Sequence, residues 1–396
     1  MLVARKTIIF ITVYPFNEDY ALKYGFEILK KRGFNIVILN IMDFVFKKDI
    51  TDKISHYNIL EQVDGIEQIS IKSGKSLSEH LNSIAGWKIA VLVVFPYIKL
   101  LYLLKKAGIP YIRTFTNVHP RMEAEFSVRC IDAAKRFMKN PASFIADLIE
   151  YKLSSRFYSP EYVILGAEAS NYKNKSLKTK VINTHSFDYD RYLRNKDKPK
   201  PSCIPEVEYY VHIANHAWEL HDNILLGIEP IFSKDEYAAL INSFFDFVEK
   251  HTGKKIIIAA YPKATEDENI YEGRPFLYET EQLIKYSSGV FCHYSGAIKF
   301  AVIHKKPICF ISTRHFNESK YHRAHFMSYA AALGADINFI DNTEHFKKLL
   351  DKGLFYYNKE CYEDYAKKYI SSDRFNERPL WDIVADTLIK DMASNE

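Results

Sequence analysis

The stretch that decides the fold reads KKIIIAAYPKA at residues 254–264 and ETEQLIKYSSGVFCHYSGAIKFAVIHKKPICFIS at residues 279–312. It contains three short apolar runs, IIIAA, GVFC and PICFI, each of which is typical of a buried strand. The first run ends in a polar loop at Tyr261 and Pro262. The second ends at His293, and a helical pattern begins almost at once. Strands that alternate with helices in this way predict a parallel sheet.

The turn after the second run, Ser295-Gly296-Ala297, is a candidate anion site. In an open α/β sheet, ligands bind at the carboxyl ends of the strands. Backbone N–H groups and the helix dipole attract an anion there. Gly296 lets the backbone approach a phosphate, and Ser295 can donate its hydroxyl. The same three residues also fit a plain helix cap, so both interpretations stay open.

The composition indicates a globular protein with room for two domains. The chain has 396 residues, of which 47% are hydrophobic and 26% are charged, and its formal net charge is +5. This weak positive charge favours anionic partners such as a nucleotide, an acidic glycan or a membrane surface. No basic stripe or recognition motif accompanies it, so we expect no nucleic-acid partner.

Cysteine usage and hydropathy indicate the compartment. The five cysteines are scattered, odd in number and form no C-x-x-C motif, which is typical of a reducing compartment. The beginning of the sequence predicts a strand and no secretion signal. No apolar run reaches the length of a membrane span. We expect a cytoplasmic protein. Residues 129–156 have an interfacial composition, so peripheral contact with the inner face of the inner membrane stays open beside ordinary helix packing.

Strand and helix patterns alternate in both halves of the chain and predict two Rossmann-like, doubly wound α/β domains facing a cleft. Residues 1–195 form the predicted N-terminal acceptor domain, in which 44–80 read as polar and irregular. Residues 206–375 form the predicted C-terminal donor domain, after a linker rich in Pro and Lys. Residues 376–396 read as a C-terminal helix that packs back toward the N-terminal domain.

At these residues the chain resembles the GT-B glycosyltransferases. The pair A-A-Y-P-K and H-Y-S-G-A-I resembles the His-Pro and Ser-rich motifs of bacterial sialyltransferases and related capsule enzymes, which bind the CMP part of a CMP-sugar. Tyr261 stands where that family has His, and Gly296 stands where a second Ser is usual. The same segment also resembles the CDP-glycerol phosphotransferases of teichoic acid synthesis, which likewise release CMP. The resemblance covers residues 254–312 well, the rest of the C-terminal half loosely, and the N-terminal half by architecture alone.

The resemblance and the position of the loops select the candidate donor-binding residues. A departing nucleotide phosphate needs positive charge and N–H donors. Each Lys or Arg has an ordinary alternative as a solvated charge, Thr280 as a helix cap and His293 as a structural histidine. The nucleotide-binding candidates are Tyr261, Pro262, Lys263, Arg274, Thr280, His293, Ser295, Gly296 and Ala297, with Lys299 as a further cation.

A base for the acceptor hydroxyl is expected on the N-terminal domain. Glu18 and Asp19 follow the first strand and are the first candidates, although acids at a helix N-terminus also complement its dipole. His119, in T-N-V-H-P, is the second candidate, and His185 lies near the domain junction. The sequence D-Y-D at residues 188–190 has the form of the GT-A metal motif, but it lies beside a linker. The resemblance to GT-B enzymes implies that no bound metal is needed, and we expect no cofactor.

Together these features predict a Leloir-type, metal-independent glycosyltransferase. We expect it to move an acidic sugar of the sialic, pseudaminic or Kdo kind from a CMP-sugar donor to a glycan or lipid-linked glycan acceptor of the bacterial surface, such as capsule or lipopolysaccharide. The alternatives that stay open are a CDP-polyol phosphotransferase, a UDP-sugar transferase or epimerase on the same fold, and a non-catalytic glycan-binding homologue.

Overall fold

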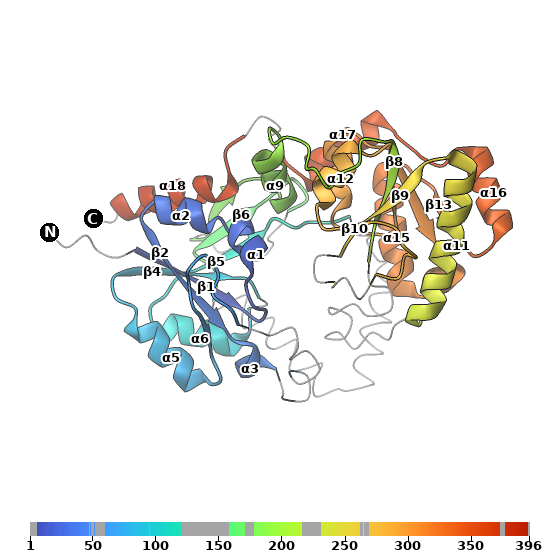
Figure 1. Cartoon of the computed structure of the whole chain (residues 1–396). Coiled ribbons are helices and arrows are strands. Elements are labelled where there is room, and N and C mark those ends of the chain that lie inside the picture. Colours follow the sequence, from blue (N-terminus) through green and yellow to red (C-terminus); the bar gives the residue numbers. More distant parts are fainter. Residues whose placement is uncertain are drawn as a thin grey trace, which may run out of the picture. The chain divides into compact units, whose positions relative to one another are not determined.

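A computed structural model of the chain describes residues 6–46, 48, 51, 60–94, 96–120, 158–170, 178–215, 231–261, 264, 269–372 and 377–394. The chain divides into two compact units. Unit 1 consists of residues 1–116, 123–190 and 373–396, and unit 2 consists of residues 117–122 and 191–372. Each unit is built around one parallel sheet, and both are shown in Figure 1.

The sheet of unit 1 has the strand order β3-β2-β1-β4-β5-β6-β7 in the part of the chain that the structure describes. All pairs of neighbouring strands are parallel. The order reverses direction at β1 and β4, which is the doubly wound arrangement expected from the sequence. The strands are β1 Lys6–Thr12, β2 Phe34–Asn40, β3 Gln68–Ser70, β4 Trp87–Leu92, β5 Tyr111–Phe115, β6 Tyr162–Leu165 and β7 Lys180–Asn183.

Helices cover both faces of this sheet. Figure 1 shows α5 and α6 on one face and α2 and α18 on the other. The strands supply alternate apolar residues to two cores, so that Ile9 and Ile11 face the first pair of helices while Ile8 and Phe10 face the second pair. The helices are α1 Glu18–Lys23, α2 Phe26–Lys31, α3 Met42–Val45, α5 Gly74–Ser83, α6 Ile98–Lys106, α9 Phe187–Asn195 (which ends in unit 2) and α18 Leu380–Ala393.

Unit 2 has a parallel sheet of its own, with the order β10-β9-β8-β11-β12-β13 among the described residues. This is again a doubly wound order, with the reversal between β8 and β11. Its strands are β8 Tyr209–Ile213, β9 Lys255–Ala259, β10 Phe276–Leu277, β11 Gly289–Cys292, β12 Ile308–Ser312 and β13 Ile337–Phe339. Its helices are α11 Lys234–Thr252, α12 Thr280–Tyr286, α13 Ile298–Ile303, α14 Arg314–Glu318, α15 Lys320–Leu333, α16 Thr343–Lys352 and α17 Lys359–Tyr369.

The α/β class and the two doubly wound sheets are therefore confirmed. One local expectation is wrong. Residues 44–80 read as irregular, yet they contain β3 and the ten-residue helix α5. The edge strand β3 is only three residues long, too short to give a periodic signal, and α5 begins with Gly74, a poor helix former.

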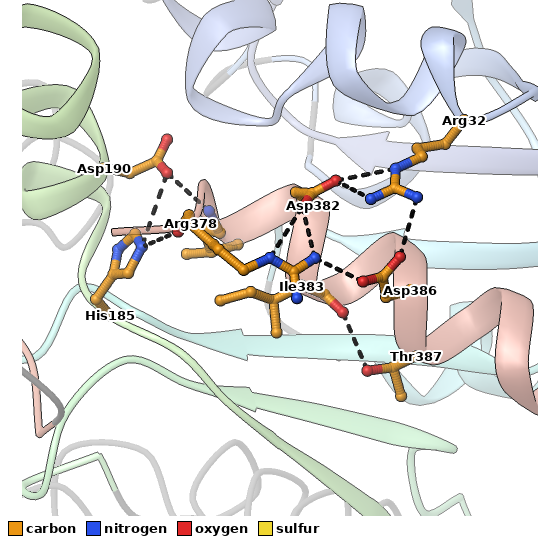
Figure 2. A network of polar contacts seen from close by, with 9 residues as sticks. Arg32, His185, Asp190, Arg378, Asp382, Ile383, Asp386 and Thr387 are labelled. Carbon is orange, nitrogen blue, oxygen red and sulfur yellow. Dashed lines mark hydrogen bonds and ion pairs between the residues drawn. The ribbon is translucent and has the colours of Figure 1, made fainter. Parts of the chain in front are cut away.

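The C-terminal helix α18 belongs to unit 1, where it is held by buried and polar contacts. Figure 2 shows Arg378 and Arg32 on either side of Asp382, and both guanidinium groups also reach Asp386, at 2.6 and 3.1 Å. These pairs are partly exposed, so each contributes little by itself. The apolar face of the helix, with Leu380 and Trp381 fully buried, supplies most of the stabilisation.

Candidate functional site

The sheet of unit 2 places the candidate site at the reversal between β8 and β11. Connections leave these two neighbouring strands in opposite directions, and ligands of open α/β sheets bind beyond the carboxyl ends of the strands at such a reversal. Asn215 follows β8 there, and residues 293–297 follow β11. The stretch that predicted the fold therefore also supplies one of the two loops at the switch point, the one after β11.

The Ser295–Ala297 turn begins the short helix α13. The Ala297 N–H donates to Ser295 Oγ at 3.2 Å, and the Ile298 N–H donates to the Ser295 carbonyl oxygen at 3.3 Å. The Ser295 hydroxyl therefore accepts from an amide within the turn, while the N-cap position of α13 is Ala297, which has no side-chain cap hydrogen bond. For the Ala297 amide to bind a phosphate, this hydroxyl must first turn away. Gly296 has no side chain, so its backbone stays open to a close neighbour.

The close neighbour of Gly296 is His119. A Cβ atom built on Gly296 would lie 3.1 Å from Cε1 and 3.8 Å from Nε2 of His119. His119 belongs to unit 2 through the segment 117–122, although its strand β5 belongs to unit 1. Its Nδ1 lies 2.9 Å from the hydroxyl of Tyr329 on α15. The structure thus brings a predicted catalytic histidine to the predicted anion turn.

Lys299 adds positive charge beneath the same turn. Its side chain is fully buried, and its Nζ donates to Asn117 Oδ1 at 3.2 Å. Asn117 and His119 therefore both lie against residues at the beginning of α13. A buried ammonium acts more strongly on a nearby anion than an exposed one, because the surrounding dielectric is lower.

His293 is a core residue in this structure. It is 1% exposed, its Nδ1–H donates to the Ile311 carbonyl oxygen at 2.7 Å, and its Nε2 accepts from the Tyr237 hydroxyl at 2.6 Å. Burial lowers the pKa of His293 to about 4, so the imidazole is neutral at pH 7. With both nitrogens engaged inside the unit, His293 supports the loop from below, which agrees with its structural alternative.

A second buried histidine lies beside it. The ring of His212 on β8 lies 5.9 Å from that of His293, and burial followed by the nearby His293 lowers the pKa of His212 well below its usual value. Neither nitrogen of His212 has a hydrogen-bond partner within the described part of the chain. Both imidazoles are therefore uncharged at pH 7 and lie in the core of unit 2.

Two further candidate positions serve packing within unit 2. Arg274 is 7% exposed and forms ion pairs with Asp246 at 2.6 Å and Glu249 at 3.1 Å. These contacts occupy the guanidinium within its own unit. Thr280 is buried and is the first residue of α12, whose N-cap is Glu279. The expectation that Thr280 caps this helix is therefore wrong by one position.

The loop after β9 is described only in part. Tyr261 is half-buried, and its carbonyl oxygen accepts from the Ala264 N–H at 2.9 Å. Pro262 and Lys263 lie outside the described residues, as do residues 216–222 and the predicted interfacial segment 129–156.

The predicted base candidates of unit 1 follow β1. Glu18 and Asp19 are exposed in the first turn of α1, whose N-cap Asn17 accepts from the Tyr20 N–H at 2.9 Å. Glu18 Oε1 also accepts from the Asp64 N–H at 3.1 Å. Both carboxylates therefore lie at the carboxyl edge of their sheet, in the position that also complements the helix dipole.

The D-Y-D sequence has a structural use in unit 1. Asp190 is buried and accepts from the Leu380 N–H at 2.8 Å, at the beginning of α18. His185 is fully buried beside it, and its Nε2 lies 3.0 Å from the Arg378 carbonyl oxygen (Figure 2). The described residues contain no group of three His, Cys, Asp or Glu side chains able to hold a metal ion.

Among the same described residues, no helix is both long enough and apolar enough to cross a membrane.

Sequence reasoning did not find the contribution of α15. Tyr329 contacts His119, and His322 Nδ1 lies 2.7 Å from the hydroxyl of Tyr294, next to the anion turn. Burial, followed by the nearby His325, lowers the pKa of His322 to about 4. Residues 322, 325, 326 and 329 follow one helical face. This spacing of aromatic and imidazole side chains is the sequence pattern from which the contribution of α15 could have been predicted.

No protein-family model matches the chain, and no curated protein matches it. Several solved structures match the chain over nearly its whole length. TagF, a wall teichoic acid polymerase, is 15% identical over 98% of this chain and 90% of its own, with a TM-score of 0.57. CalG4, the calicheamicin glycosyltransferase, is 12% identical over 98% of both chains, with a TM-score of 0.53. The two parallel-sheet domains are thus of the GT-B type, and identities this low establish the fold alone.

Proposed function

We propose that this chain is a glycosyltransferase that moves an acidic sugar from a CMP-sugar donor to a surface-glycan acceptor. The observation that carries the proposal is the approach of His119 to Gly296, at the point where the sheet of unit 2 reverses direction. A bare backbone turn, an imidazole and a buried lysine together fit the phosphate of a departing nucleotide. The cytidine specificity rests on the resemblance of residues 254–312 to CMP-sugar enzymes.

In the proposed reaction the acceptor oxygen forms a bond to the anomeric carbon of the sugar. The bond from that carbon to the CMP phosphate oxygen breaks, and its electron pair leaves with CMP. Lys299 and the Gly296 turn stabilise the charge that develops on the phosphate, and His119 hydrogen-bonds to it. The acceptor proton passes to a carboxylate, for which Glu18 and Asp19 are the first candidates. No step requires a bound metal, so activity should persist in EDTA.

A CDP-polyol phosphotransferase is the second candidate. It is favoured by the fold likeness to TagF, of which one structure was obtained with CDPG, at 17% identity and a TM-score of 0.55. In that reaction the acceptor attacks the β-phosphorus and CMP leaves again. The same turn and the same cation would therefore serve, and the two candidates differ in the group that is transferred.

A nucleotide panel in a thermal-unfolding assay tests the proposal. A ligand at about 100 times its Kd adds ~2.7 kcal/mol to the free energy of unfolding. We expect stabilisation by CMP and CDP and none by UDP. Transfer from CMP-sialic acid against CDP-glycerol, with released CMP measured, then separates the two candidates. Stabilisation by UDP alone would favour a UDP-sugar transferase or epimerase. No stabilisation by any nucleotide would favour a glycan-binding homologue.

A further inference from the structure

Unit 1 contains a pocket that the proposed chemistry does not use. Its volume is about 420 Å³, within the usual range of ~300–1,000 Å³ for small-molecule sites. The described lining residues come from α3, α5 and α6 and from the segment before β6. They are Phe44, Gly74, Ile98, Lys99, Tyr102, Leu103 and Tyr158. The lining is thus aromatic and aliphatic, and Lys99 is the one charged residue among those named.

The pocket runs along α6, from the carboxyl edge of the sheet toward Tyr158, which precedes the amino end of β6. α3 follows the carboxyl end of β2, α5 follows that of β3, and α6 follows that of β4. Residues from the beginnings of α5 and α6 line it, and α5 and α6 cover the same face of the sheet in Figure 1. Ligands of open α/β sheets bind outside this edge. The end of the pocket lined by Gly74 and Ile98 therefore lies at the edge where ligands of such sheets bind.

Gly74 leaves the space open. A Cβ atom built there would lie 3.5 Å from both Leu103 Cδ1 and Phe44 Cε2, which is ordinary van der Waals contact. Any side chain longer than that of alanine must extend into or past these walls. Tyr102 borders the same space and is 53% exposed, so an aromatic surface is open to solvent there.

One lysine borders the pocket and others are near it in the sequence. Lys99 borders the pocket, and four further exposed lysines lie on the same helices or just before them: Lys72, Lys75, Lys105 and Lys106. Lys105 Nζ also lies 5.3 Å from the ring centre of Tyr158. An apolar interior bordered by Lys99, with Lys105 over Tyr158, is complementary to an amphiphile that carries a negative headgroup, because the hydrocarbon chain and the charge each contact a matching surface.

We propose that this pocket binds the hydrocarbon chain of a lipid phosphate, the lipid end of the acceptor, with Lys99 beside the phosphate. The inference rests on the proposed transfer function for naming that lipid as the acceptor. A free sugar fits the site poorly, because its hydroxyls need several convergent polar side chains and the named lining offers mainly apolar ones.

Binding of farnesyl phosphate to the full chain tests the proposal. Gly74→Leu should weaken binding about tenfold, the loss expected when two methylene groups of the chain are excluded. Tyr102→Asp should weaken it as well, and its exposed position leaves the fold intact. Lys99→Glu should weaken binding most at low salt. The matched control Lys347→Glu makes the same charge change on an exposed position of unit 2 and should leave binding unchanged.

Three comparisons keep the outcome decisive. Farnesol should bind with no dependence on Lys99, because it lacks the phosphate. Equal binding of farnesyl phosphate to wild type, Gly74→Leu and Tyr102→Asp would contradict the proposal that this pocket binds the lipid. Flotation with phosphatidylglycerol vesicles that depends on Gly74, without binding of farnesyl phosphate, would overturn the acceptor assignment in favour of a membrane phospholipid. Affinity for CMP should be the same in all variants. If no nucleotide stabilises the protein but farnesyl phosphate still binds, the proposed transfer function is contradicted and the lipid-binding pocket is not.

Discussion

Trp381 occupies the space that a side chain on Gly25 would need. A Cβ atom built on Gly25 would lie 2.5 Å from Trp381 Cβ and 2.6 Å from Cγ, and the glycine has a left-handed φ of +63°. The indole Nε1–H donates to the Lys23 carbonyl oxygen at 3.0 Å. The C-terminal helix α18 can therefore pack at the junction of α1 and α2 because residue 25 has no side chain.

This contact predicts the effects of two substitutions on stability. Trp381→Ala should lower the free energy of unfolding by ~3–5 kcal/mol, the usual cost of removing a large buried aromatic ring. Gly25→Ala should also destabilise, through backbone strain and a clash with the indole. Gly33→Ala is the matched control, because Gly33 has a φ of +83° but open space around it. Urea unfolding of the three variants measures the difference. Equal losses for the two glycine variants would contradict the close packing of Trp381.

The buried histidine His293 predicts a loss of stability in acid. Its pKa is lowered to about 4 in the folded chain, against about 6.5 when unfolded. Between these values the unfolded chain binds more protons, so stability falls as the pH falls from about 6.5 to 4, by about 3 kcal/mol for this group.

In His293→Gln the unfolded chain can no longer bind a proton at residue 293. The free energy of unfolding should therefore depend less steeply on pH. His322 and His212, whose pKa values are also lowered by burial, should keep part of the slope. The exposed His251 supplies the control His251→Gln, which should keep the wild-type slope. An unchanged slope for His293→Gln, measured by denaturant titrations at pH 4.5, 5.5 and 7.5, would show that His293 is solvated in the folded chain.

The Gly296 turn predicts a loss of nucleotide affinity. Gly296→Val should block the approach of a phosphate and displace His119, since even a Cβ atom at residue 296 lies 3.1 Å from that ring. CMP affinity, measured by calorimetry on folded protein, should fall by at least an order of magnitude, since an excluded charge-assisted contact is worth ~1.5–3 kcal/mol.

Combining this substitution with His119→Ala separates two explanations. If the valine blocks the phosphate directly, the double variant should bind CMP as poorly as Gly296→Val. Recovery of affinity in the double variant would mean that displacement of the imidazole caused the loss. Unchanged affinity in Gly296→Val itself would reduce the turn to a helix cap.

The carboxylates of α1 predict a loss of turnover without loss of donor binding. Removal of a general base costs ~10²–10⁴-fold in rate, so Glu18→Gln or Asp19→Asn should reduce transfer by that order. CMP affinity should stay near wild type, because the proposed donor site consists of unit 2 residues. Glu27→Gln, on the neighbouring helix, is the control and should keep full activity. If both α1 variants turn over normally, the acids serve the helix dipole and His119 becomes the next base to test, because His185 is fully buried with both ring nitrogens against carbonyl oxygens.

Local patterns predicted much of the fold. Apolar runs between polar loops indicated β9, β11 and β12, because each of these strands is buried on both faces and reads as continuous hydrophobic sequence. The short edge strand β3 could not be found in this way, since Gln68 and Ser70 contribute no apolar alternation. The N-cap of α12 was assigned to the wrong residue, because Thr280 is a preferred N-cap type and Glu279, which occupies the position without a side-chain cap hydrogen bond, is not.

The sequence by itself determined the two doubly wound sheets and the Ser295-Gly296-Ala297 turn after β11, because these depend on periodicity and on residues adjacent in the chain. The tertiary structure decided which distant residues meet. His119 reaches Gly296, and Trp381 reaches Gly25, across separations that no local pattern encodes. It also decided that His293 and Arg274 are buried with partners inside unit 2. Burial and pairing depend on how helices pack on the sheet, and that packing is a property of the whole unit.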